Sequence, residues 1–357
     1  MKKIVIVLLV LITVGCSSKN EEKTFVSKDG CDTLNVYNWG EYAASDFISN
    51  FEDEYNVKVN YSLFSSNEEM YTSIKNGANY DVIIPTDYIY SLLIEDDLVQ
   101  KIDHTKLTNL DNIIEGLKTP DFDPNLEYTI PYLWGNVGII YDKTVVSQED
   151  VEKLGYGIFH EEKYSDVGVV LYDSPLDAFM VALKNLGYSA NTTNKDELDE
   201  AYEWLDKAAK TMNAQYMQDE IYDPIIYGDI KLSFVYSGVA SYIMQENENI
   251  AFYAPQEGTV LWTDSLLITK NTECYDLAHT FLDYAIREDV AYNNSEYVGY
   301  TSPIQGVVDE LTKQGGLYEN NSAYMPRLNY DLDEYYTSNL EVKEYITELW
   351  MKIKYEN

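Results

Sequence analysis

The chain has 357 residues, of which 61 are Asp or Glu and 25 are Lys or Arg, so its formal net charge is -36. This charge makes nucleic acid an unfavourable partner and attracts small cations, while a hydrophobic content of 45% predicts a fully folded protein. One hydrophobic core rarely serves a chain of this length, and we therefore expect two lobes.

The first residues form an export signal. Two lysines precede an apolar run over 4–14, which is too short to span a membrane as a mature helix. The sequence TVGC at 13–16 resembles the lipobox of bacterial lipoproteins, with threonine where leucine is usual, and marks Cys16 as the acylated residue. We expect a signal peptide with its lipobox cysteine over 1–16 and a polar tether over 17–31. The mature protein is then held at the outer face of the cytoplasmic membrane or in the periplasm.

The cysteines and histidines predict no metal site. The three histidines are scattered along the chain, and no cluster has the spacing of metal ligands. Cys31 and Cys274 remain in the mature fold, where export permits a disulfide. Pairing needs Cα atoms within about 7 Å, a condition that the sequence leaves open.

The first half of the chain alternates predicted strands and helices, with a Ser66–Glu69 capping box at the start of one helix. This order predicts an α/β fold with a mainly parallel sheet flanked by helices. The expected strands cover 34–37, 57–61 and 80–84, and the expected helices cover 43–55 and 66–77.

Polar and aromatic residues follow two of these strands directly. They are Trp39, Glu41 and Tyr42 after the first strand, and Thr86 and Tyr88 after the third. Ligands of α/β sheets lie beyond the carboxyl ends of strands, and aromatic faces beside a carboxylate suit an organic cation. A buried Trp and Tyr beside a solvated Glu, and a helix N-cap at Thr86, are the structural alternatives.

The second half continues the pattern after a lobe crossing. Segment 128–141 predicts two strands with a break near Gly135, and a strand over 169–172 leads to a helix that ends at Gly187. Ser174 as N-cap before a proline is a good helix start, so Asp177 is either part of that start or a ligand contact. Further elements are a helix over 195–210 and a strand over 231–236 that ends in Tyr236.

Trp262 and Asp264 lie within the otherwise apolar segment 260–268. An acid inside such a run is expensive to bury without a cationic partner or strong hydrogen bonds. The alternative is a carboxylate that caps backbone amides at a lobe crossing. We favour a ligand contact for Asp264.

Six motifs in order carry a family resemblance: YNWGEY, YDVIIPTDY, IPYLWGNVGI, LGYSANTT, LWTDSLLI and VGYTSPI. From residue 34 to about 355 the chain resembles the spermidine/putrescine-binding proteins of ABC importers, within the periplasmic-binding-protein-like superfamily. The resemblance implies two α/β lobes that close over a cleft, without catalysis or cofactor. It also implies a monomer with a polyamine ligand and an ABC permease as partners. We assign 32–138 plus 264–302 to the first lobe and 139–263 plus 303–357 to the second.

The resemblance also implies the ligand contacts, which are Trp39, Glu41, Tyr42, Thr86, Tyr88, Asp177, Tyr236, Trp262 and Asp264. Thr86 stands where serine is usual and Tyr236 where tryptophan is common. More loosely aligned positions are Asp173, Ser174, Gln218 and Tyr336, and Ser174 replaces an aspartate that spermidine-selective relatives can carry. The sequence does not rank spermidine against putrescine.

Three alternatives stay open. The same fold can bind another small solute, although the expected site lacks the basic residues of an anion site and has more acids than a sugar site. An exported enzyme is the second alternative, but no G-x-S-x-G elbow, phosphate-binding glycine loop or histidine cluster is visible. A surface adhesin that reuses the fold is the third.

Overall fold

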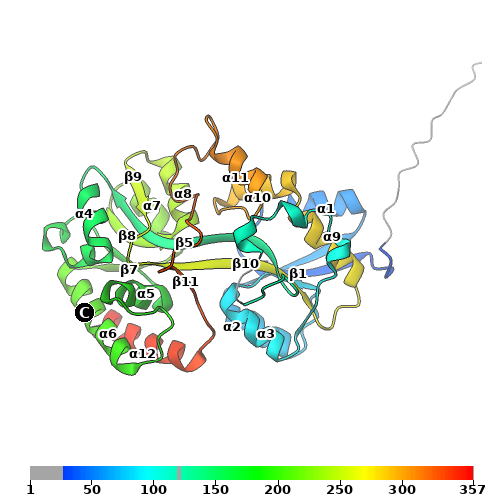
Figure 1. The fold of residues 1–357 in the computed structure, drawn as a ribbon, viewed down its shortest axis with the longest axis horizontal. Coiled ribbons are helices and arrows are strands. Elements are labelled where there is room, and N and C mark those ends of the chain that lie inside the picture. Colours follow the sequence, from blue (N-terminus) through cyan, green and yellow to red (C-terminus); the bar gives the residue numbers. More distant parts are fainter. Residues whose placement is uncertain (1–26, 119–121, 357) are drawn as a thin grey trace, which may run out of the picture.

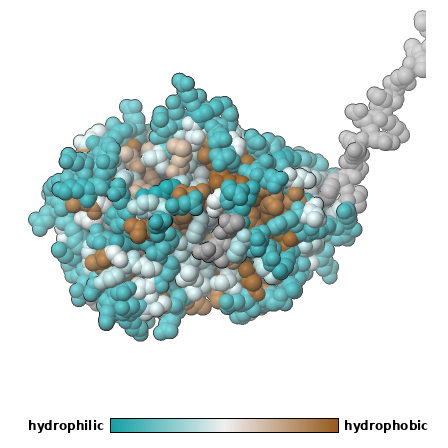
Figure 2. All heavy atoms as spheres, in the orientation of Figure 1, coloured by the Kyte–Doolittle hydropathy of each residue, from teal (hydrophilic) through white to brown (hydrophobic). Residues whose placement is uncertain are grey.

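The computed structural model describes residues 27–118 and 122–356; the predicted signal peptide, Cys16 and most of the tether lie outside them. The described residues form the predicted two-lobed α/β architecture, in which the long strands β5 (Ile130–Asp142) and β10 (Val260–Thr269) run from one lobe into the other (Figure 1). The face drawn in Figure 2 is mostly hydrophilic, with smaller apolar groups between.

The first lobe holds the elements from β1 to β4 and three helices from later in the chain. Strand β1 lies between β2 and β3 and is parallel to both, as the alternating sequence pattern predicted. A core that includes Phe51 and Phe281 fills this lobe. Its elements are β1 (Thr33–Trp39), α1 (Phe47–Tyr55), β2 (Lys58–Phe64), α2 (Asn67–Lys75), β3 (Val82–Ile83), α3 (Tyr90–Glu95), β4 (Val99–Gln100), α9 (Tyr275–Ala285), α10 (Glu288–Val298) and α11 (Gln305–Thr312).

The second lobe is built around the far halves of β5 and β10. Strands β8 and β9 pair antiparallel with β5, and helices α5, α6 and α12 pack together at one side (Figure 1). Its elements are α4 (Gln148–Leu154), β6 (Val170–Tyr172), α5 (Pro175–Leu186), α6 (Lys195–Met212), β7 (Gln215–Met217), α7 (Tyr222–Ile226), β8 (Leu232–Tyr236), α8 (Ser237–Glu246), β9 (Ile250–Tyr253), β11 (Glu334–Tyr335) and α12 (Leu340–Glu356).

Local sequence explains several helix ends. The Ser66 side chain caps α2 by accepting a hydrogen bond from the Glu69 amide at 3.2 Å. The Glu69 carboxylate accepts from the Ser65 amide at 2.9 Å instead of closing the predicted box on Ser66. Pro175 stands in the first turn of α5, and Gly187 ends that helix in the left-handed conformation, with φ 80.

Strand β5 corrects two expectations. It is one continuous strand of 13 residues, whereas two strands with a break near Gly135 were predicted. Glycine is needed there for close packing, because a Cβ on Gly135 would lie 2.6 Å from Cζ2 of Trp262. The pairing of β5 with β10, β8 and β9 is antiparallel, so the sheet is mixed and not mainly parallel. The long strands that cross between the lobes run antiparallel to their neighbours, except that β10 is parallel to β11.

The two largest of the three hydrophobic cores among the described residues, one in each lobe and here called the first and the second core, locate the crossing. Trp134 of β5 packs in the first core and Val137 in the second, so β5 passes between them near Gly135. Ile304 and Leu311 pack in the first core, whereas 303–357 was assigned to the second lobe. The assignment is therefore wrong for α11, and the other predicted boundaries stay a prediction.

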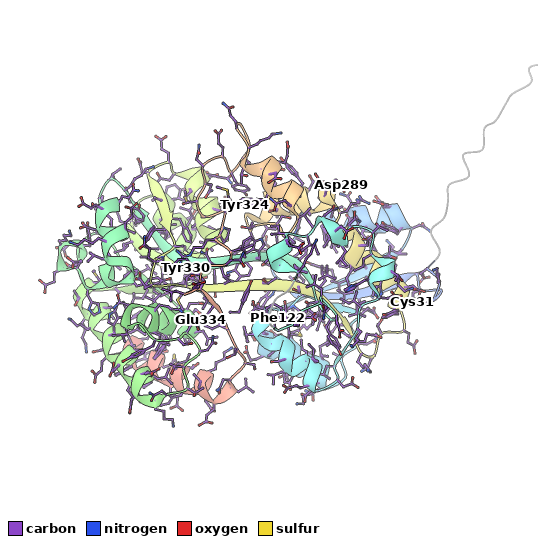
Figure 3. All side chains as sticks on the ribbon, viewed as in Figure 1. Cys31, Phe122, Asp289, Tyr324, Tyr330 and Glu334 are labelled. Atoms are coloured by element: carbon purple, nitrogen blue, oxygen red, sulfur yellow. A yellow bond between two sulfur atoms is a disulfide. The ribbon has the colours of Figure 1, made fainter. Side chains whose placement is uncertain are left out.

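Cys31 and Cys274 form a disulfide, with their Cα atoms 5.6 Å apart. This answers a question that the sequence left open. Cys31 lies at the end of the first lobe that points away from the second lobe (Figure 3), and Cys274 directly precedes α9. The bond ties the start of the described chain to a helix of the first lobe. Within 27–118 and 122–356, no helix combines the length and the apolar character needed to cross a membrane.

Candidate functional site

Asp264 is a buried carboxylate with one oxygen left without a partner. Its side chain is 5% exposed, and its Oδ2 accepts a hydrogen bond of 2.5 Å from the Tyr42 hydroxyl. Its Oδ1 has no hydrogen-bond partner among the described residues. Burial raises the pKa of Asp264 to about 6, although the nearby Thr86 hydroxyl and the hydrogen bond from Tyr42 oppose the rise. A buried oxygen of this kind favours a cation beside it.

The fold brings the ends of β1 and β3 to the middle of β10 at Asp264. Tyr42 follows β1, and Thr86 follows β3 and forms an antiparallel bridge with Asp264 of β10. The pairing of β10 with β5 shifts register between Asp264 and Ser265. Such irregularities re-aim a side chain that a regular ladder would hold on one face.

Asp177 is a second buried carboxylate, in the first turn of α5 and 3% exposed. It accepts hydrogen bonds from the hydroxyls of Ser174 at 2.6 Å, Tyr236 at 2.5 Å and Tyr336 at 3.0 Å. Burial raises the pKa of Asp177, and these three hydrogen bonds lower it. The three donors are neutral, so they hold the carboxylate in place without balancing its charge.

Four aromatic rings connect the two carboxylates. We call Tyr42, Tyr300, Trp262 and Tyr236 the aromatic row. The ring of Tyr300 lies 5.6 Å from that of Tyr42 and 5.2 Å from that of Trp262, and Trp262 lies 6.1 Å from Tyr236. Tyr42 bonds Asp264 and Tyr236 bonds Asp177, so the row has a carboxylate at each end.

This arrangement suits an elongated organic cation. Ring faces cover methylene groups and attract positive charge, while the carboxylates accept hydrogen bonds from ammonium groups. None of the ion pairs among the described residues includes Asp177 or Asp264. Within the same residues, no group of three or more His, Cys, Asp or Glu is placed to hold a metal ion.

Comparison with known proteins identifies the family. The family model described as bacterial extracellular solute-binding protein matches residues 46–325. This chain belongs to that family. The matched range includes both carboxylates and every ring of the aromatic row except Tyr42.

Similar solute-binding proteins are named for polyamines. The spermidine/putrescine-binding periplasmic protein of Salmonella typhimurium is 35% identical over 281 residues, which cover 76% of this chain and 78% of that protein. The protein of the same name from Escherichia coli is 34% identical over 284 residues, covering 77% and 78%. A crystal structure of the spermidine/putrescine ABC transporter substrate-binding protein of Streptococcus pneumoniae superimposes with a TM-score of 0.78 at 28% identity, covering 90% of this chain and 98% of that one.

Trp39, Glu41 and Tyr88, the other predicted contacts of this solute-binding protein, form no hydrogen bond with either carboxylate among the described residues. Trp39 is half-buried at the end of β1, where its ring packs 4.4 Å from that of Phe64. Its indole Nε1 is buried without a partner among the described residues. Glu41 is exposed and has a left-handed backbone, with φ 52. The Tyr88 hydroxyl donates a hydrogen bond of 3.2 Å to Glu68.

The loosely aligned positions separate into two groups. Ser174 and Tyr336 both bond Asp177. Asp173 instead accepts a hydrogen bond of 2.8 Å from the indole of Trp350 and forms an ion pair with Lys354, so it holds α12 in place. Gln218 is exposed. Ligand contact by any of the predicted residues stays a prediction.

Sequence reasoning missed Tyr300, Glu68 and Lys343. Tyr300 lies within the motif VGYTSPI, so position in a matched motif was the available signal. A Cβ on Gly238 would lie 2.0 Å from the Tyr300 ring, which shows how closely the ring packs on α8. Lys343 lies in a charged helix far along the chain, and no local pattern distinguishes it from a surface lysine.

Proposed function

We propose that this solute-binding protein captures a polyamine between its lobes and delivers it to an ABC importer. The observation that carries the proposal is the aromatic row with a buried carboxylate at each end, neither of which has a cationic partner in the described chain. The names of the similar proteins support a spermidine or putrescine ligand. The protein acts by binding, without catalysis or a cofactor.

In this proposal the ligand lies extended across the two lobes. Trp39, Tyr236 and Trp262 cover its methylene groups, and Asp264 and Asp177 accept hydrogen bonds from its ammonium ends. Glu41 contributes from the exposed rim. Buried charge pairs roughly offset their own desolvation, so the carboxylates supply specificity and the aromatic faces supply much of the net affinity.

Closure is a hinge motion of the lobes about β5 and β10, which hides the ligand and completes the surface that the permease recognises. We infer that the protein acts as a monomer outside the cytoplasmic membrane. Acylation of Cys16 anchors it there, because each buried methylene of an acyl chain adds about 0.8 kcal/mol of membrane affinity.

Calorimetric titration of the purified protein with putrescine, cadaverine, spermidine and spermine tests the proposal. We expect saturable binding of at least one of them. γ-Aminobutyrate is the matched control, because it replaces one ammonium of putrescine with a carboxylate and should meet repulsion at one of the two aspartates. The absence of binding to all four amines at millimolar concentration would refute a polyamine function.

A further inference from the structure

Lys343 places its ammonium in a cation site on the opposite lobe. Its Nζ forms an ion pair with Glu68 of α2. It also donates a hydrogen bond of 3.3 Å to the Tyr88 hydroxyl and lies 4.9 Å from the centre of the Tyr88 ring. A carboxylate, a phenol oxygen and an aromatic face are also the groups that bind the amine of a ligand. Here they bind the ammonium group of Lys343 instead.

The site joins the two lobes. Lys343 belongs to α12, whose buried residues pack in the second core, and Glu68 belongs to α2 of the first lobe. Among the ion pairs of the described residues, theirs is the one that joins the lobes. Burial raises the pKa of Asp177, and the positive charge of Lys343 is among the influences that lower it. Lys343 and Tyr336 line one small cavity, and the Tyr336 hydroxyl bonds Asp177, so Lys343 lies near the Asp177 end of the aromatic row.

The distribution of charge limits how many ligand amines the cleft can hold. Asp264 and Asp177 are buried and lack cationic partners, so two ammonium groups balance them. Asp87 is a third buried carboxylate, close to Asp264, and it accepts a hydrogen bond of 2.7 Å from the Thr263 amide. Burial and the charge of Asp264 raise the pKa of Asp87 well above its usual range, which favours its neutral form, so we count no further ammonium for it. Glu68 is already balanced by Lys343. Glu41 is exposed to water and needs no counter-charge.

We propose that Lys343 is an internal cation that occupies the outermost amine position of the cleft, so that the protein selects a diamine over a triamine. The inference rests on the proposed polyamine function and adds a specificity-determining residue to it. A triamine must displace Lys343 from Glu68 and the Tyr88 face, or leave its third ammonium beside a like charge. A diamine meets neither obstacle.

Calorimetric titration of the full-length protein with putrescine, cadaverine and spermidine tests this inference. For the wild type we expect a spermidine Kd at least tenfold larger than the putrescine Kd. Lys343→Gln removes the internal cation and frees Glu68, so we expect the ratio of the two dissociation constants to fall at least tenfold. The ratio is the readout because loss of the lobe-to-lobe ion pair weakens every ligand alike.

Lys354→Gln is the matched control. Lys354 lies on the same helix and also pairs with an aspartate, but that partner is Asp173 of its own lobe. This variant should leave the ratio within a factor of two. The inference is overturned if the wild type binds spermidine as tightly as putrescine, an outcome that needs no variant and leaves the polyamine function intact. It is also overturned if a folded Lys343→Gln protein keeps the wild-type ratio within a factor of two. Failure to bind any amine overturns the polyamine function as well.

Discussion

Replacement of Asp264 by asparagine tests whether this residue binds the ligand or has only a structural role. Asp264→Asn keeps the size of the side chain and an acceptor for the Tyr42 hydroxyl, but it deletes the buried charge. Removal of one member of a buried charge pair typically costs about 2–5 kcal/mol of binding. That range corresponds to a polyamine Kd about 30- to 5000-fold larger than that of the wild type.

The same change should stabilise the ligand-free protein at neutral and higher pH. Folding raises the pKa of Asp264 from 3.8 to about 6, so the folded state holds its proton more tightly than the unfolded state. The ionised carboxylate therefore destabilises the fold above pH 6, by about 3 kcal/mol for a shift of this size. The penalty fades as the pH falls from 6 to 3.8. The new amide N–H of asparagine costs about 1–3 kcal/mol if it finds no partner, so the net effect at pH 8 is zero or stabilising.

Thermal unfolding of the ligand-free wild type and variant at pH 8 and pH 4.5 shows whether the substitution raises or lowers stability. We expect the asparagine variant to melt at an equal or higher temperature at pH 8 and to lose any advantage at pH 4.5. Asp173→Asn is the contrasting control, because Asp173 is paired with Lys354 and its loss should lower stability without changing the Kd. Polyamine binding retained within a factor of three, or an Asp264→Asn protein that is clearly destabilised at pH 8, would show that Asp264 is a structural acid.

Three further predictions concern the first turn, the disulfide and the anchor. Trp39→Ala should weaken polyamine binding by at least the free energy of a cation–π contact, which is about 0.5–2 kcal/mol. An unchanged Kd in a folded variant would show that the turn after β1 is purely structural. Loss of the Cys31–Cys274 bond, as Cys31→Ser, should lower the free energy of unfolding by about 2–5 kcal/mol, measured with denaturant, because the bond closes a long loop. The Kd should not change, and a Kd shifted tenfold would contradict a purely stabilising role. Cys16→Ser should release the protein from membranes or leave it unprocessed, and equal membrane retention on fractionation would remove the lipoprotein claim.

The part of the site that sequence could predict is the part set by strand ends. Apolar runs in the sequence indicate buried strands, and the residues that follow parallel strands meet at one edge of the sheet. This logic grouped Tyr42 with Thr86, and the family resemblance added Asp264. The structure places the three side chains together through a hydrogen bond and a strand bridge. The helix start that contains Asp177 could also be predicted from the sequence, because Pro175 is a local signal for the first turn of a helix.

The parts that could not be predicted depend on contacts between distant segments. Gly135 looked like a strand break because glycine weakens strands, but its role depends on where the Trp262 ring lies. Asp173 and Asp177 are four residues apart with similar surroundings in the sequence. Asp173 nevertheless bonds side chains of α12, whereas Asp177 accepts hydrogen bonds from three hydroxyl groups. The position of Lys343 depends on how α12 docks against the opposite lobe, which no local pattern encodes.

The position of Asp264 along β10 joins ligand binding to the motion of the lobes. Val260, near one end of this strand, packs in the second core, and Leu266 packs in the first. Asp264 lies between them, where the pairing with β5 shifts register and is therefore less regular than the strand on either side. In the proposed hinge motion, a cation bound at Asp264 would touch the segment about which the lobes turn, and its charge would act on closure as well as on affinity. Loss of that charge should consequently raise the dissociation rate more than it lowers the association rate, because association precedes closure.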